Sequence, residues 1–234
     1  MVKKIFFHTD ACQAAGALDL DVEKLGVDLL TINGSKIYGP KGVGALYIRR
    51  GTPIEALIHG GGQERNLRSG TENVAAIVGL ATALELAQAE RETENARLIC
   101  LRDKLIAGIL KTVPKSRLNG HPEKRLPNNV NITLLDVEGE AMLLYLDEHG
   151  IQAATGSACD SATLDPSHVI VALGLPYEFA HGSLRFTLGK STSETDVDYV
   201  VEVLPKVVNI LRKVSPLNLE LDPKLNSHAQ IIQH

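Results

Sequence analysis

The stretch from residue 31 to residue 44 constrains the fold most, because it places a lysine in a glycine-rich loop between two apolar runs. The runs, residues 27–32 and 45–48, are rich in aliphatic side chains and are typical of buried β-strands. Glycine permits turns that other residues avoid, and proline fixes φ. Lys36 is therefore expected where one strand ends and the next begins, a common position for functional side chains. The turn-forming residues are Gly34, Gly39, Pro40, Gly42 and Gly44.

Lys36 has two interpretations. Most loop lysines are solvated surface charges. A lysine that forms a Schiff base must instead lose its proton near neutral pH, through partial burial or a cationic neighbour. A second short apolar run, residues 5–8, leads to Asp10, again at a predicted strand end. A carboxylate beside the ring nitrogen of pyridoxal phosphate keeps that nitrogen protonated, so Asp10 favours the second interpretation.

Residues 35–50, Ser-Lys-Ile-Tyr-Gly-Pro-Lys-Gly-Val-Gly-Ala-Leu-Tyr-Ile-Arg-Arg, resemble the lysine segment of cysteine desulfurases, members of the aminotransferase class V family of pyridoxal phosphate enzymes. Residues 60–71, 156–162 and 183–189 are similar to further signatures of that family, in the same order. The resemblance implies an α/β fold: part of the large domain of a fold-type I pyridoxal phosphate enzyme, then a small α+β domain. It begins in the middle of the family's pattern, as in an N-terminally truncated enzyme.

The resemblance also implies roles for residues of the first third. Lys36 holds the cofactor aldehyde as an imine, Asp10 pairs with the pyridine nitrogen, and Gln13 hydrogen-bonds the phenolic oxygen. Asn33 and Ser35 occupy phosphate-contacting positions where the family usually has serine and histidine. Both can donate hydrogen bonds, but neither brings the charge of a histidine, so weaker cofactor binding is expected.

The polar, glycine-rich segment 58–71 is expected to be a loop. In the family it reaches across a homodimer interface, so that Thr71 would touch the phosphate of the partner's cofactor. Arg65 and Arg68 have the simpler interpretation of surface charges. Cys12 is expected to pack as a small hydrophobic residue.

Two further residues are candidates for the chemistry. Cys159 lies among glycine, serine, alanine and threonine, which bury little, so its loop is expected to move. In a desulfurase such a thiolate attacks the sulfur of L-cysteine and carries it away as a persulfide. Arg185 is a single arginine in a short apolar strand, and its guanidinium would suit the carboxylate of an amino acid.

Composition narrows the class of protein. The 234 residues carry a net charge of −4, which gives no broad electrostatic reason to expect nucleic acid binding. No apolar run is long enough for a membrane span and the apolar stretch near the N-terminus is too short for a signal peptide, so a cytoplasmic protein is expected. Cysteines 12, 100 and 159 lack metal-ligand spacing, which predicts free thiols and no metal site.

Periodicity predicts the remaining elements. Residues 73–112 are expected to form two helices separated by a charged stretch. The first helix, within residues 72–94, is expected to join two domains. Three parts are expected. Residues 1–95 would form the C-terminal half of the large domain together with its connecting helix, and residues 96–214 would form the small domain. Residues 215–234 would form an irregular tail. Later strands are expected at 129–135, from 150 and at 182–188. Further helices are expected at 21–25, 139–148, 167–173 and 195–214.

The favoured function is a cysteine desulfurase, which takes sulfur from L-cysteine for iron–sulfur cluster assembly or tRNA thiolation and passes it to an acceptor or scaffold protein. The isolated chain is expected to be a poor enzyme unless another chain supplies the other half. Two alternatives remain: another class V enzyme, such as a selenocysteine lyase, an aminotransferase or a kynureninase-like hydrolase, and a non-catalytic fragment or docking module for sulfur-handling proteins.

Overall fold

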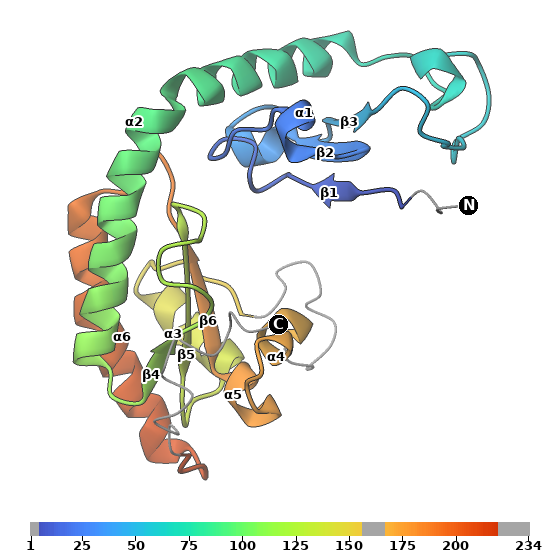
Figure 1. The fold of residues 1–234 in the computed structure, drawn as a ribbon. Coiled ribbons are helices and arrows are strands. Elements are labelled where there is room, and N and C mark those ends of the chain that lie inside the picture. Colours follow the sequence, from blue (N-terminus) through green and yellow to red (C-terminus); the bar gives the residue numbers. More distant parts are fainter. Residues whose placement is uncertain (1–4, 156–166, 220–234) are drawn as a thin grey trace. The chain divides into compact units, whose positions relative to one another are not determined.

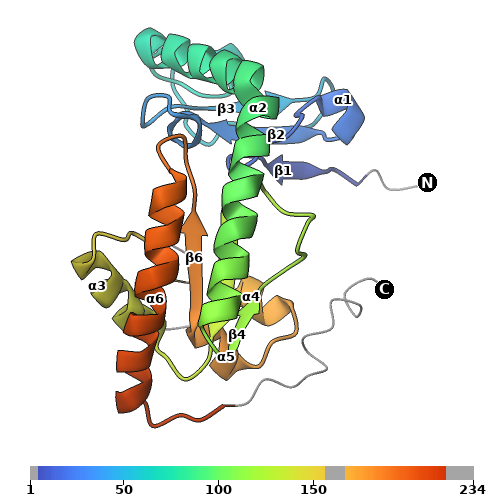
Figure 2. The ribbon, with the colours of Figure 1, turned by 90° about the vertical axis from the view of Figure 1, so that its left-hand side faces the viewer.

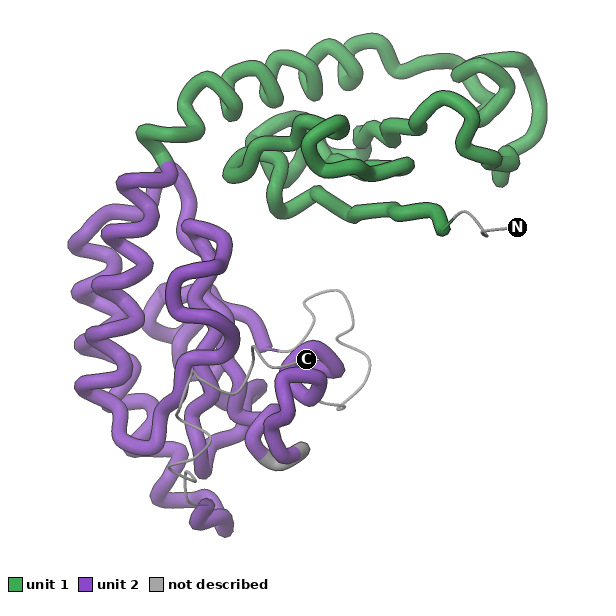
Figure 3. The backbone as a smooth tube through the Cα atoms, in the orientation of Figure 1, with its two compact units in different colours: residues 1–94 green, residues 95–234 purple. Residues whose placement is uncertain are grey.

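The computed structural model describes residues 5–155 and 167–219. The chain divides into two compact units, residues 1–94 and 95–234, against an expected boundary after residue 95 (Figure 3). Each unit contains its own three-stranded sheet. Cys159 lies outside the described residues, so its predicted mobile loop has no structural description here.

The sheet of the first unit has the order β1-β2-β3 (Figure 1). β1 (His8–Asp10) runs parallel to β2 (Leu29–Asn33), and β3 (Gly44–Ile48) runs antiparallel to β2. Alternate β2 side chains, Leu30 and Ile32, are buried in the core of this unit. The predicted strands around the lysine segment are thus confirmed within one or two residues.

The first strand begins later than expected. The sequence favoured a strand at residues 5–8, yet pairing starts at His8, and Ile5 is 88% exposed. At Phe7 the backbone N–H donates to the Asp28 carboxylate Oδ2 at 3.0 Å, while the carbonyl accepts the N–H groups of Asp28 and Leu29 at 2.8 and 3.1 Å. Only from His8, opposite Leu29, does a regular ladder begin. Asp10 is consequently the last residue of β1, still at a strand end.

A single helix, α2 (Val74–Thr112), replaces the two helices expected from the sequence. Its 39 residues pass from the first unit into the second without a break. Residues 88–97, which carry the charges that suggested an interruption, contain no glycine or proline and are mostly good helix formers. Charge alone does not end a helix, so the expected interruption was wrong.

Substitution of Ala96 tests this continuity. Proline at position 96 is expected to lower the free energy of unfolding by about 3 kcal/mol, because it removes a helical hydrogen bond and clashes with the preceding turn. Glycine at the same position should cost only about 1 kcal/mol. Denaturant unfolding followed by circular dichroism measures both. Equal, small losses would indicate that the helix is interrupted near residue 96.

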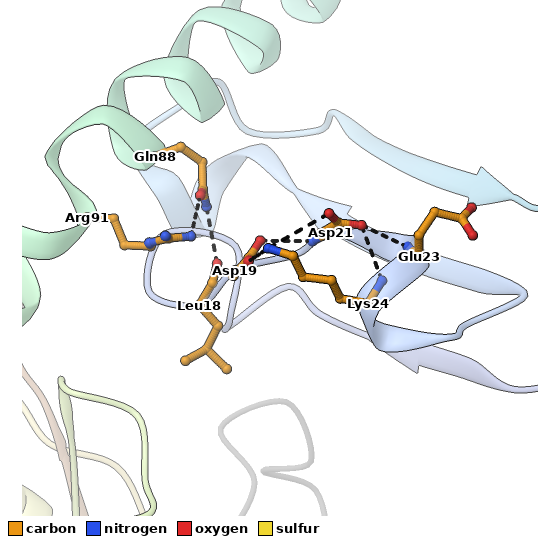
Figure 4. A network of polar contacts seen from close by, with 7 residues as sticks. All are labelled: Leu18, Asp19, Asp21, Glu23, Lys24, Gln88 and Arg91. Carbon is orange, nitrogen blue, oxygen red and sulfur yellow. Dashed lines mark hydrogen bonds and ion pairs between the residues drawn. The ribbon is translucent and has the colours of Figure 1, made fainter.

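A polar network attaches α2 to the turns that follow β1 (Figure 4). Gln88 Nε2 donates to the carbonyls of Ala15 at 2.6 Å and Leu18 at 3.3 Å, and Arg91 donates to Gln88 Oε1. The same turns lead through Asp19, which pairs with Lys24, to α1 (Val22–Leu25). This network fixes the segment directly after Asp10 within the first unit.

The second unit is an antiparallel sheet of order β4-β5-β6 with helices packed on it (Figures 1 and 2). The strands are β4 (Ser116–Leu118), β5 (Asn129–Leu134) and β6 (Ser183–Thr187). One face of the sheet is apolar and packs against α2 and α6 (Glu194–Val214), which lie side by side in both views. Buried members of this core include Leu105, Ile109, Val130, Ile132, Leu146, Leu184, Leu204 and Val207.

Several predicted elements of this unit are confirmed. α3 (Gly139–Glu148) has the expected bounds, and α4 (His168–Ala172) lies within the expected helix. Ser193 begins α6 as predicted: its hydroxyl accepts the N–H of Asp196, whose carboxylate accepts the N–H of Ser193. The helix α5 (Tyr177–His181), directly before β6, was not predicted.

The strand expected from residue 150 is absent from the described part of the second unit. Gly150 has a φ of +71° and turns the chain away after α3, with its N–H bonded to Asp147. Only Ala154 then reaches β6, where it forms an isolated bridge with Arg185. Among the described helices of both units, none combines the length and apolar character that crossing a membrane requires.

Candidate functional site

The carboxyl ends of β1 and β2 bring together the residues expected to hold a cofactor. The two strands are parallel, with Asp10 opposite Thr31, so both end at one edge of the sheet. Asp10 is the last residue of β1, and Asn33 is the last residue of β2. In open α/β sheets, ligands bind at this kind of edge. Lys36 follows three residues after β2, in the 3₁₀ helix η1 (Gly34–Ile37).

The segment from Asn33 to Gly44, here called the Lys36 loop, is closed by its own backbone. The Gly34 N–H donates to the Val43 carbonyl at 3.0 Å, and the Gly34 carbonyl accepts from Gly39 at 2.9 Å. Asn33 caps η1, because its Oδ1 accepts from the backbone N–H and the hydroxyl of Ser35 at 2.8 and 2.7 Å. Lys36 is exposed, so its amine is accessible to a ligand.

The closed backbone of the Lys36 loop leaves no room for a side chain at Gly34. A Cβ at position 34 would lie 2.8 Å from the Pro40 carbonyl and 3.0 Å from Val43. Gly34→Ala is therefore expected to lower the free energy of unfolding of the first unit by about 1–3 kcal/mol. Gly16→Ala is the matched control, since its Cβ would make only ordinary contacts at 3.4 Å or more. Equal unfolding midpoints for the two variants would contradict this account of the loop.

Asp10 is held as a carboxylate. Its Oδ1 accepts the backbone N–H of Cys12 at 3.0 Å. The pKa of Asp10 is lowered by its interactions with the Cys12 side chain and with the Cys12 N–H, with a smaller contribution from the charge of His8. The side chain is exposed, so a ligand can reach it. An accessible, ionised carboxylate at this edge suits a protonated ring nitrogen.

Cys12 lies closer to the site than the sequence suggested. It is only half-buried, and its Sγ is 3.9 Å from the Thr31 carbonyl. Burial and the neighbouring Asp10 raise the pKa of the Cys12 thiol to about 11, while the charge of Lys36 acts in the opposite direction. The pKa of the thiol therefore depends on both the Asp10 carboxylate and the Lys36 amine. In the sequence, only the position of Cys12 two residues after Asp10 indicated that it lies near the site.

Other predicted cofactor contacts lie on exposed segments of the first unit. Gln13 is exposed in the turn after β1, and Thr71 is exposed just before α2. Within the described residues, no hydrogen bond joins Thr71 to the Lys36 loop, and its role across a dimer stays a prediction. The segment before Thr71 contains the short 3₁₀ helix η2 (Glu64–Asn66), in which all three residues have positive φ. Arg65 and Arg68 are exposed.

Arg185 belongs to the second unit, in the middle of β6. Its backbone pairs with Asn131 of β5 and bonds with Ala154 on the other side. The side chain is half-buried, and its Nε is inaccessible to solvent and has no hydrogen-bond partner within residues 5–155 and 167–219. A buried guanidinium nitrogen without an acceptor is costly, so an anionic ligand for Arg185 is physically reasonable.

Comparisons with known proteins identify relatives of the chain. A protein from Methanosarcina thermophila named cysteine desulfurase IscS is 56% identical over 214 residues, which are 92% of this chain and 53% of that protein. Cysteine desulfurase NifS of Azotobacter vinelandii is 49% identical over 212 residues, again 53% of its length. A solved NifS-like protein from Rickettsia africae superimposes with a TM-score of 0.79 at 31% identity, covering 87% of this chain and 54% of that one.

The chain spans about half the length of the curated relatives it matches. The fold of the relatives supports the predicted class, a partial fold-type I enzyme with mixed α/β units. Residues 1–200 match the family described as aminotransferase class-V. This match extends over most of both units, from β1 to the first turns of α6. The chain therefore belongs to the aminotransferase class-V family.

Proposed function

We propose that the chain forms part of a pyridoxal phosphate-dependent cysteine desulfurase, which converts L-cysteine to L-alanine and retains the sulfur. One observation carries the proposal. Asp10 is the last residue of β1, Lys36 follows the end of β2 by three residues, and the two strands are parallel, so their carboxyl ends lie at the same edge of the sheet. The chain that holds them is 56% identical to a protein named cysteine desulfurase IscS. The alternative of another class V enzyme has no comparable support among these relatives.

The groups at this edge fit pyridoxal phosphate. Asp10 offers an ionised carboxylate for the pyridine N–H, and Lys36 offers an accessible amine for the aldehyde. Asn33 places its side-chain amide at the start of η1, where the NH₂ group could donate to a phosphate, whereas the Ser35 hydroxyl donates to Asn33 Oδ1. The charges of the Asp10 carboxylate and of Lys36 both act on the half-buried Cys12 thiol. When bound, the cofactor would act as the electron sink for charge that develops on the substrate carbon.

The chain's own groups would then handle substrate and sulfur. Arg185, whose Nε has no hydrogen-bond partner among the described residues, would bind the substrate carboxylate. Lys36 Nζ would remove a proton from the substrate carbon and later return protons to the product. The Cys159 thiolate would attack the substrate sulfur: a sulfur–sulfur bond forms, the carbon–sulfur bond breaks, and the electron pair leaves with the carbon. Cys159 is left as a persulfide and the carbon skeleton as alanine.

The setting of this activity is also a proposal. The exposed segment around Thr71 is compatible with a homodimer in which each protomer completes its partner's site. The persulfide would pass to an acceptor or scaffold protein in iron–sulfur cluster assembly or tRNA thiolation. The two cysteines of the described residues, Cys12 and Cys100, are free thiols, which suits a cytoplasmic location.

Product analysis tests the proposal. The purified chain is incubated with pyridoxal phosphate and L-cysteine, and the amino and keto acids released are identified by mass spectrometry. L-Alanine is the expected product, formed slowly because the isolated chain is expected to be a poor enzyme. A keto acid in place of alanine, from a chain that binds the cofactor, would instead indicate another reaction of the family.

A further inference from the structure

Residues 215–219 follow α6 and are held against the second unit by two polar contacts and one apolar contact. The Leu219 N–H donates to Asp136 Oδ1 at 2.6 Å. Asn218 Oδ1 accepts from Lys115 Nζ at 2.8 Å, and the Leu219 side chain packs against a small apolar cluster. The two hydrogen bonds join residues 83 and 103 positions apart, so tertiary contacts fix this short segment.

Asp136 links these contacts, because its two oxygens accept from different segments. Oδ2 accepts from Lys115 Nζ at 2.8 Å, and Oδ1 accepts from the Leu219 backbone. The Asp136 side chain is only 7% exposed. Burial alone would raise the pKa of Asp136, but the bonds from Lys115 and Leu219, together with the charges of Lys115 and Arg212, lower it overall. Asp136 is therefore a buried carboxylate, and the loss of one of its partners is expected to be costly.

The backbone brings Asp136 and Lys115 together at one end of the sheet. The Leu135 N–H donates to the Lys115 carbonyl at 3.0 Å, which continues the pairing of β4 with β5. Arg212, in the last turn of α6, donates to the carbonyls of Leu135 and Pro114. The end of α6 is thus fixed beside Asp136, and the chain that continues from it can reach both Asp136 and Lys115.

The apolar cluster that Leu219 contacts is separate from the main core of the second unit. Its buried members come from the end of β5, from α4 and α5, and from the turn between these helices: Leu135, Ile170, Leu175, Phe179 and Ala180. The two helices pack on each other, and α5 packs on β5 (Figures 1 and 2). Helices of five residues are not stable by themselves, so the position of α4 and α5 depends on this cluster.

We propose that residues 216–219 act as a strap, which Asp136 and Lys115 hold in place and whose Leu219 side chain keeps α4 and α5 packed on the second unit. The strap is built from this chain alone and needs no cofactor. Only its consequence for the chemistry rests on the proposed function: α4 is the first described element after Cys159, so the strap would fix the element that follows the reactive thiol in the chain.

Two substitutions test the apolar and the polar half of the strap. Leu219→Ser removes the apolar contact and keeps the backbone N–H. Asp136→Asn keeps the shape of the side chain and a residue type that tolerates the positive φ of +65° found here. An amide accepts through one oxygen only, so it cannot serve both Lys115 and Leu219. Leu217→Ser is the matched control, because Leu217 belongs to the same strap but is 51% exposed.

Backbone hydrogen exchange of the full chain, followed by mass spectrometry of its peptides, reports the opening of α4 and α5. Exchange in residues 168–181 is expected to become faster by about tenfold or more in Leu219→Ser and in Asp136→Asn. A buried leucine, or a hydrogen bond to a charged group, contributes enough free energy for a change of that size. Exchange in this region should stay at the wild-type rate in Leu217→Ser.

Residues 98–109 of α2, which contribute to the main core, are the internal reference. Their exchange should be unchanged in all three variants, which shows that the second unit is still folded. Wild-type exchange of α4 and α5 in both Leu219→Ser and Asp136→Asn would overturn the proposal. So would an equal acceleration in Leu217→Ser, or one as large in α2 as in α4 and α5, because the contacts would then stabilise the whole unit.

These measurements are made without cofactor, so the strap and the proposed function can fail separately. A chain that binds no pyridoxal phosphate but shows the expected exchange would retain the strap and lose the proposed function. A chain that releases alanine from L-cysteine but shows wild-type exchange in both variants would retain the proposed function and lose the strap.

Discussion

Lys36→Ala is expected to reduce alanine release from L-cysteine by about 10²–10⁴-fold, the range that a proton-transfer group contributes to catalysis. Lys36 is accessible at the strand edge that also carries Asp10, and it is the amine proposed to move the substrate proton. The loop around it is closed by backbone bonds of Gly34, so removal of the side chain should leave the fold unchanged. The rate is measured as alanine formed in the presence of pyridoxal phosphate.

Lys41→Ala is the matched control, because Lys41 is an exposed lysine of the same loop. Its alanine release should remain close to that of the wild-type chain. Circular dichroism and the unfolding midpoint should be unchanged in both variants. A Lys36→Ala chain that retains wild-type activity, or a loss equally large in Lys41→Ala, would contradict the assignment of Lys36.

Cys159→Ser is expected to abolish sulfur retention on the chain. A hydroxyl is a far weaker nucleophile than a thiolate and cannot take over the substrate sulfur. After incubation with L-cysteine and cofactor, intact-mass and peptide analysis of the wild-type chain should find one additional sulfur atom on Cys159. The variant should gain none and should release little alanine.

Cys100→Ser provides the comparison, since Cys100 is an exposed thiol on α2 that the proposed chemistry does not use. It should gain sulfur on Cys159 as the wild type does. Sulfur found on Cys12 or Cys100 and absent from Cys159 would show that another thiol receives it. Sulfur on all cysteines alike would indicate free sulfide reacting without direction.

Much of the fold could be predicted because local signals and packing agree. The periodicity of α3 and the capping serine at the start of α6 located those helices closely. The glycines around Lys36 predicted a tight turn between two strands, and the hydrogen bonds of Gly34 explain why. The resemblance to desulfurases then assigned roles that periodicity alone could not.

Other features depend on contacts that a linear pattern does not contain. The charged stretch before Arg97 suggested an interruption, but nothing in it prevents a helix from continuing. The apolar run at residues 5–8 suggested a strand, yet the Phe7 N–H donates to the Asp28 carboxylate and Ile5 is exposed. The contact of Cys12 Sγ with the Thr31 carbonyl follows from the parallel pairing of β1 and β2, which no linear pattern contains.

The most direct test of the central claim is to locate the cofactor chemically. The chain is incubated with pyridoxal phosphate, treated with borohydride to make any bond to an amine permanent, and digested for peptide mass spectrometry. The account predicts that the cofactor is attached to Lys36, that Lys41 remains unmodified, and that Asp10→Asn weakens the attachment. Cofactor spread over several surface lysines, or fixed to a lysine outside the Lys36 loop, would contradict it.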